Sequence, residues 1–277
     1  MALNEIVLPN GERVRLGNRP SEHGKLKASW TEFGTTPEQR MIPRPEWDGL
    51  IAQYEPGPLH SFLQPTHYQN GVGQCNADDT TALIEFCRAV QGLPYVQLSA
   101  ADLYARINGG RDEGSLLEDA MAEVIRNGVG TAATCGTLWK RGEFRGEAGA
   151  AERARFRVLE AYLCPTFDHC FSASLQGFGL STGIPWYDNY TPDADGWLPR
   201  PSGDSGGHAI FGYKPAKRGT AYGIWHQNSW GESWGLKGKF VIPESAYQGG
   251  GIGGWWACKA VVDEGGVVPS EQLSEVI

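Results

Sequence analysis

The sequence predicts an α+β protein in which a helical lobe packs against a strand-rich lobe. Helical patterns and loops dominate up to about residue 165, and short strand-like runs separated by Gly, Pro and Asn follow. The chain has 277 residues, of which 40% are hydrophobic and 20% charged, an ordinary globular composition that allows a sizeable core. Two such lobes leave a cleft between them, where active sites commonly lie.

The N-terminal region differs from the rest of the chain. Residues 1–40 are polar, with Gly, Pro and scattered charge, and we expect an arm with a hairpin that turns at Asn10-Gly11. Residues 41–74 are rich in Pro and aromatic residues without periodicity, which predicts an extended segment over the core. We therefore divide the chain into an arm (1–40), a main domain (41–262) and a C-terminal tail (263–277).

Apolar spacing and capping signals predict the helices of the first lobe. A helical face begins at Asn76, with Asp78 and Asp79 placed to interact with its positive N-terminal end. Capping-box-like starts at Ser99 and Ser115 predict two more helices, and the second of these stops at Asn127-Gly128. The remaining expected elements are a helix over about 148–163 and strands over 177–186, 208–213, 222–227 and 239–242.

Charge and hydropathy argue against several classes of function. The net charge of −8 gives no electrostatic reason to expect nucleic acid as a partner. No apolar run approaches the roughly 18–20 residues that span a bilayer, so we expect no membrane association. The N-terminus lacks the basic start and apolar middle of a signal peptide, so a cytoplasmic location is expected.

The six cysteines are widely spaced, which does not predict a disulfide scaffold. Cys164, His169 and Cys170 cluster in sequence, but their spacing fits no familiar zinc pattern, and we expect no metal. The glycines of 249–254 follow no strand–helix context that would make a phosphate cradle. No cofactor is therefore expected.

Cys75 is a candidate nucleophile. It precedes a predicted helix, and a helix N-terminus beside an imidazolium favours the reactive thiolate. A structural, buried thiol is the alternative. Asp78 and Asp79 either face inward, where their charge would disfavour the thiolate, or face solvent, where they would only cap the helix.

His208 is the candidate partner because two glycines precede it and a predicted strand follows. Glycine allows close backbone approach, which is useful at the wall of a cleft. A catalytic histidine also needs a group that orients its second nitrogen. Asn228 follows the next predicted strand, and Trp230 and Trp234 could shield that hydrogen bond from water.

Four separated motifs give the chain a resemblance to the papain-like cysteine peptidases. They are the order Gln69, Cys75, His208, Asn228; the string Asn228-Ser-Trp-Gly followed by Trp234-Gly; Gly207-His-Ala; and Leu98-Ser followed by Asn108-Gly-Gly. The resemblance covers about residues 65–245. It implies a papain-like fold, a helical lobe and an antiparallel sheet or barrel lobe with the active site in the cleft between them.

The resemblance also implies roles. Cys75 would attack the substrate carbonyl, His208 would hold the thiolate and protonate the leaving amine, and Asn228 would orient His208. Gln69 would donate to the oxyanion together with the Cys75 N–H. Substrate contacts are expected at Gly73 and Gly110 and at Trp230. A polar pocket for the second residue before the cleaved bond is expected at Arg111, Asp112 and Ala209.

Several positions depart from the family pattern. Asn76 and Asp78 replace aromatic residues, and Gly207 replaces an acidic one. Val72 and Ile107 replace a pair of cysteines, which fits a reducing compartment and resembles bacterial or phage-encoded members. The short arm reads as a propeptide, a structural flap or a docking segment for an assembly such as a phage particle.

Three functions stay open at this stage. The first is a thiol peptidase acting on peptide or protein substrates. The second is a catalytically weak or inactive papain-fold component of an assembly such as a virion, docked through the arm; a Cys75 deeply buried beneath residues 1–60 would favour it. The third is an amide hydrolase of cell-wall peptides, although such hydrolases usually have a shorter Cys–His gap.

Overall fold

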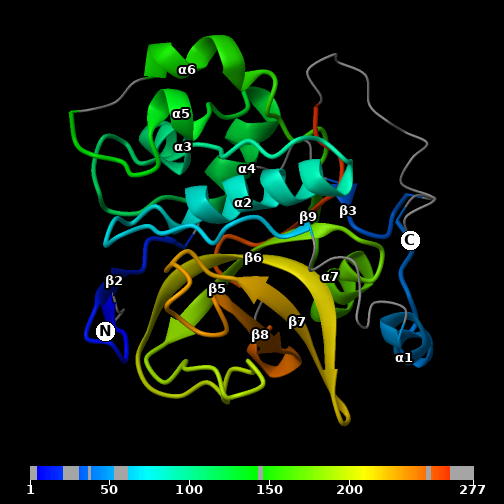
Figure 1. The fold of residues 1–277 in the computed structure, drawn as a ribbon. Coiled ribbons are helices and arrows are strands. Elements are labelled where there is room, and N and C mark those ends of the chain that lie inside the picture. The colour runs from blue at the N-terminus through cyan, green and yellow to red at the C-terminus, as the bar shows by residue number, and fades with distance from the viewer. Residues whose placement is uncertain are drawn as a thin grey trace.

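The computed structural model describes residues 5–20, 31–36, 39–52, 62–142, 146–247 and 251–262. Most helices gather on one side of the molecule and a twisted sheet lies on the other, with the long helix α2 (Cys75–Val90) between them (Figure 1). Two helices, Arg44–Ile51 and Phe167–Ser174, lie beside the sheet. This arrangement confirms the predicted α+β class. Among the described residues, no helix is both long and apolar enough to cross a membrane.

Helix α2 (Cys75–Val90) is the centre of the fold. It packs on β5 (Gly179–Tyr187) and β6 (Ser205–Arg218) on one side and on α3 (Ala100–Ile107) and α4 (Leu117–Arg126) on the other. Fourteen of its 16 residues are buried, so even its polar side chains lie inside the protein. Leu83 and Phe86 contact the sheet at Gly179, where an added Cβ would lie 2.4 Å from the Leu83 side chain. The glycine therefore allows the helix and the sheet to approach closely.

The other helices of this lobe cover the far side of α2. Helix α3 (Ala100–Ile107) begins as predicted, because the Ser99 hydroxyl accepts a hydrogen bond from the Asp102 N–H. Helix α4 (Leu117–Arg126) ends as predicted at Asn127, followed by Gly128 with φ of +81°. Two shorter helices complete the lobe: α5 (Ala132–Cys135) and α6 (Gly146–Arg153).

Two helix predictions were wrong in detail. The Ser115 side chain does not cap α4; its hydroxyl instead accepts a hydrogen bond from the Asn76 amide. The helix expected over 148–163 ends at Arg153, and Tyr162–Leu163 forms strand β4. Strand pairing with β9 outweighs the local helical pattern there.

The second lobe is built on a seven-stranded sheet with the order β3-β4-β9-β5-β6-β7-β8. All neighbours are antiparallel except β3 and β4. The four predicted strands are confirmed, and β6 is longer than expected. The strands are β3 (Thr31–Glu32), β4 (Tyr162–Leu163), β5 (Gly179–Tyr187), β6 (Ser205–Arg218), β7 (Ala221–Gln227), β8 (Lys239–Pro243) and β9 (Trp255–Cys258).

Some elements were not predicted. The segment 41–74, expected to be extended, contains α1 (Arg44–Ile51), which starts at a proline and buries Trp47 and Ile51. Helix α7 (Phe167–Ser174) spans the cysteine-rich stretch, where His169 bonds to Thr166 and lies near Glu32 rather than joining the buried cysteines. The described residues contain no cluster of three potential metal ligands.

The predicted N-terminal hairpin is present. Strands β1 (Glu5–Val7) and β2 (Arg13–Arg15) pair in antiparallel fashion, and Gly11 adopts a φ of +83° in the turn. The chain then continues from β2 toward the N-terminal end of α2 (Figure 1). The tail 263–277 lies outside the described residues.

Candidate active site

Cys75 is the first residue of α2, and its side chain is completely buried. Burial raises the pKa of the thiol to about 12, and backbone hydrogen bonds from Ala209 and Gly17 lower it only in part. The charges of Asp78 and Asp79 raise it further. In this state Cys75 is therefore a neutral thiol, although its place at a helix N-terminus is one that can favour a thiolate.

His208 lies on β6, and Asn228 follows directly after the neighbouring strand β7. The two side chains meet through a hydrogen bond of 2.9 Å between His208 Nε2 and Asn228 Oδ1. An amide oxygen only accepts, so this bond puts the ring proton on Nε2. His208 Nδ1 is buried and makes no hydrogen bond to the described residues. The ring is thus oriented with one basic nitrogen free.

Aromatic rings enclose this pair. Trp230 stacks on the His208 ring with 4.8 Å between centroids, and Trp186 meets the same ring edge-on at 5.2 Å. Trp234 packs in turn against both tryptophans. Burial lowers the pKa of His208 to about 4, and the bond to Asn228 offsets this only in part. The imidazole is therefore neutral near pH 7.

Gln69 lies in the loop before α2, and its amide is held at its oxygen. Gln69 Oε1 accepts from the Ser229 hydroxyl at 2.7 Å and from the Trp230 indole at 3.1 Å. These two donors fix the amide so that Nε2 donates on its other side, to the carbonyls of Val72 and Arg15. A preorganised donor of this kind is what an oxyanion hole requires.

Residues 13–19, which we call the strap, cross the site. The Gln69 Nε2 donates to the Arg15 carbonyl at 3.0 Å, and Gly17 lies against Cys75. Asn18 N–H donates to the Gly207 carbonyl at 3.0 Å, directly before His208. On the opposite wall, Ser115 pairs with Asn18 in a parallel bridge. The strap thus lies on both walls of the cleft and over the thiol.

Glycines make this close packing feasible. A Cβ on Gly17 would lie 2.0 Å from the Gly73 carbonyl oxygen, and one on Gly207 would lie 1.8 Å from that of Asn18. Only residues without a Cβ fit there. The sequence pointed to close backbone approach before His208, and the approaching backbone is that of the strap.

Two expected substrate contacts lie elsewhere. Gly110 is exposed in the turn after α3, where its N–H donates to Asn108, and Arg111 is exposed and near Glu113. The cleft wall is formed a few residues later: Ser115 N–H donates to the Gly17 carbonyl at 2.8 Å, and the Ser115 carbonyl accepts from Arg19.

The remaining expected contacts border the strap or the histidine. Gly73 N–H donates to Asp112 at 2.9 Å, Ala209 donates toward Cys75, and Trp230 covers His208. Sequence reasoning missed Arg15, Gly17 and Asn18 because nothing in a polar arm indicates where it docks. It interpreted Ser115 as a helix cap.

Asp78 and Asp79 point inward. Asp78 lies 3.2 Å from His67 Nδ1, whose Nε2 lies 3.2 Å from Glu85, and Asp79 accepts from the Ser181 hydroxyl. Burial lowers the pKa of His67, but the charge of Glu85 and the bonds to both carboxylates raise it to about 10. His67 is therefore a buried cation that partly balances the acids near Cys75.

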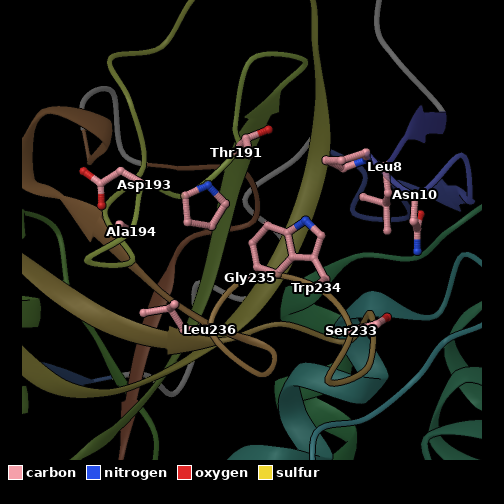
Figure 2. Close-up of a pocket in the computed structure, with 11 residues that line it drawn as sticks. Leu8, Asn10, Thr191, Asp193, Ala194, Ser233, Trp234, Gly235 and Leu236 are labelled. Carbon is pink, nitrogen blue, oxygen red and sulfur yellow. The ribbon is translucent and has the colours of Figure 1, made fainter.

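A cavity of about 370 Å³ lies apart from Cys75, His208 and Gln69. Figure 2 shows Leu8 and Asn10 of the N-terminal turn at one side, Thr191, Asp193 and Ala194 at the other, and Trp234 between them. None of the four expected catalytic residues lines it. It borders the site only through Trp234.

No protein-family model matches the sequence. No curated protein matches it either.

Solved structures do resemble the chain. Xylellain, a cysteine protease from Xylella fastidiosa, aligns with a TM-score of 0.65 at 18% identity over 88% of this chain and 95% of that one. Procathepsin B from Trypanosoma congolense aligns at 0.63 and 16% identity, over 87% and 85%. Bromelain from Ananas comosus aligns at 0.57 and 16%, over 74% and 96%. The chain therefore has the papain-like fold.

Proposed function

We propose that this protein is a cysteine peptidase that hydrolyses peptide bonds. The observation that carries the proposal is the 2.9 Å bond from His208 to Asn228, which orients a histidine whose other nitrogen is free. Cys75 begins the central helix α2 and lies against the backbone of Ala209, the residue after His208, and Gln69 presents a fixed amide donor in the loop before that helix. These residues can supply the nucleophile, base, orienting group and oxyanion donor that the proposal needs.

The reaction follows from these roles. His208 Nδ1 takes the proton of the Cys75 thiol, and the sulfur attacks the scissile carbonyl. Gln69 Nε2 donates to the oxygen that gains negative charge. His208 returns its proton to the departing amine, which leaves an acyl group on Cys75. Water, deprotonated by His208, then attacks this thioester. The C–S bond breaks to release the carboxylic acid, and His208 returns the proton to the Cys75 sulfur.

The strap makes the described state a latent one in this proposal. It excludes water from the site, and burial pushes the pKa of Cys75 up and that of His208 down. Both groups are then neutral. When the strap leaves, water enters, the two pKa values approach each other, and the thiolate–imidazolium pair becomes accessible.

One observation favours a second candidate, the inactive assembly component. Cys75 is fully buried and lies against Gly17 of the arm. A strap held by hydrogen bonds can dissociate, however, and a protein without catalysis has no need of an oriented His208 or a fixed Gln69. The two candidates differ in whether Cys75 reacts once the strap is displaced.

The test is intact-mass labelling with E64, the inhibitor bound in the bromelain structure. We would use the full chain carrying Gly17→Ala, in which the added Cβ meets the Gly73 carbonyl, at low millimolar reductant. A single adduct that is lost with Cys75→Ser and strongly slowed with His208→Ala supports the peptidase. Slow labelling spread over several cysteines, unchanged by His208→Ala, contradicts it.

A further inference from the structure

Asp112 lies at the cleft wall with one carboxylate oxygen fixed and the other directed at the strap. Asp112 Oδ1 accepts from the Gly73 N–H and from the Tyr104 hydroxyl, both at 2.9 Å. The Tyr104 hydroxyl itself accepts from the Gly114 N–H at 3.0 Å. Two groups of the main domain therefore hold this carboxylate oxygen, and a third, the Gly114 N–H, positions the Tyr104 hydroxyl. None of the three belongs to the strap.

The second carboxylate oxygen of Asp112, Oδ2, binds the guanidinium of Arg15. Arg15 Nη1 donates to Asp112 Oδ2 at 2.7 Å and to the Asp112 carbonyl at 3.1 Å. Both side chains are partly buried, with 36% of Arg15 and 26% of Asp112 exposed. When the strap leaves, Asp112 stays in place through Gly73 and Tyr104, and its Oδ2 loses its cationic partner.

The contacts of Arg15 show that a single residue can reach both Asp112 and the oxyanion donor Gln69. The Arg15 carbonyl oxygen accepts from Gln69 Nε2 at 3.0 Å while its side chain reaches Asp112. One residue therefore spans the oxyanion donor and the carboxylate. In a substrate, the carbonyl at that donor is the one that Cys75 attacks, and it belongs to the residue immediately before the cleaved bond.

We propose that Asp112 selects substrates with arginine or lysine immediately before the cleaved bond. This inference rests on the proposed peptidase function and names its substrate class. Arginine is favoured over lysine, because the guanidinium can donate to both the carboxylate and the backbone carbonyl of Asp112 as Arg15 does. A neutral side chain leaves Oδ2 without a cation, and an acidic one is repelled.

The experiment compares two peptides that differ only at this position, one with arginine and one with citrulline, its neutral isostere. The enzyme is the full chain carrying Arg15→Ala and Gly17→Ala, so that the strap no longer competes. With Asp112 present, we expect kcat/KM to favour arginine about 10- to 100-fold, the range for a charge-assisted hydrogen bond. Asp112→Asn, which keeps an acceptor for Gly73 and Tyr104, should bring the ratio of the two kcat/KM values, arginine peptide over citrulline peptide, close to one.

The neighbouring exposed acid supplies the matched control. Glu113, 65% exposed, pairs only loosely with Arg111 at 3.9 Å, so Glu113→Gln should keep the full preference. Equal cleavage of both peptides by the Asp112 enzyme would overturn the specificity while the peptidase function stands. Failure to cleave either peptide would overturn the peptidase function, and the specificity with it.

Discussion

At the scale of single residues, the proposed function gives Gln69 a part in both catalysis and latency. Its Oε1 is held by Ser229 and Trp230, so the direction of its N–H donors is fixed before any substrate arrives. In the described state that donor holds the Arg15 carbonyl. The group that would stabilise the oxyanion thus also retains the strap, and one substitution should alter both properties.

Gln69→Glu keeps the acceptor for Ser229 and Trp230 but replaces the donor with oxygen. In the strap-released chain (Arg15→Ala, Gly17→Ala) we expect kcat to fall about 10²- to 10³-fold, the usual loss for one oxyanion donor, with KM little changed. Steady-state hydrolysis of a peptide substrate measures this. A fall in kcat/KM that came entirely from KM would show that Gln69 binds substrate and does not stabilise the oxyanion.

The site residues that could be predicted from the sequence were those whose proposed chemistry requires a particular residue type. Cys75, His208 and Asn228 were predicted from residue type and position, and Gln69 from the family resemblance. The structure places His208, Asn228 and Gln69 in one hydrogen-bonded cluster around Trp230. Arg15 and Asn18 were not predicted, because they dock partly through backbone groups and a polar side chain in an arm does not indicate its partner. Gly207, which predicted a close backbone approach before His208, was the only partial indication of where the strap docks.

At the scale of elements, the loop before α2 is joined to that helix by buried charges. His67 on the loop contacts Asp78 and Glu85 on α2, and the other Glu85 oxygen accepts from the Leu98 N–H at 2.7 Å. The loop that carries Gln69 is therefore fixed to the helix that carries Cys75. The cation in this cluster should make the stability of the fold depend on pH.

The pKa of His67 is about 10 in the folded protein, against 6.5 for an ordinary histidine. Its stabilising contribution is complete below about pH 6.5 and is lost as the pH rises toward 10. Relative to His67→Gln, the free energy of unfolding should fall by about 1.4 kcal/mol per pH unit in that window. Urea unfolding of both proteins from pH 6 to 10 measures the difference, and parallel profiles would mean that His67 is uncharged.

Element prediction succeeded where one local pattern dominated. The face of α2, the Ser99 cap and the strands over 208–213 and 222–227 follow from their own sequences. Strand β4 did not, since Tyr162–Leu163 is extended only because β9 and β3 pair with it from distant parts of the chain. Likewise α1 lacks clear periodicity and is held mainly by its buried Trp47 and Ile51.

At the scale of the whole molecule, the strap connects the two lobes through hydrogen bonds. The strap joins Ser115 on the helical side to Gly207 on the sheet side, and the Asn18 side chain donates to the Ile252 carbonyl at 2.7 Å. Removing the strap therefore changes access to the site without altering the residues of either wall. Latency and catalytic competence should be separable by a single change in the arm.

The most direct test of this account is the rate of peptide hydrolysis by three full-length proteins under reducing conditions. Gly17→Ala places a Cβ against the Gly73 carbonyl, whereas Gly49→Ala, the control, adds one in open space on α1. We predict that Gly17→Ala hydrolyses an arginine peptide at least about tenfold faster than wild type and Gly49→Ala, and that adding Cys75→Ser abolishes this activity. Equal rates in all three proteins, or turnover that survives Cys75→Ser, would contradict a latent cysteine peptidase.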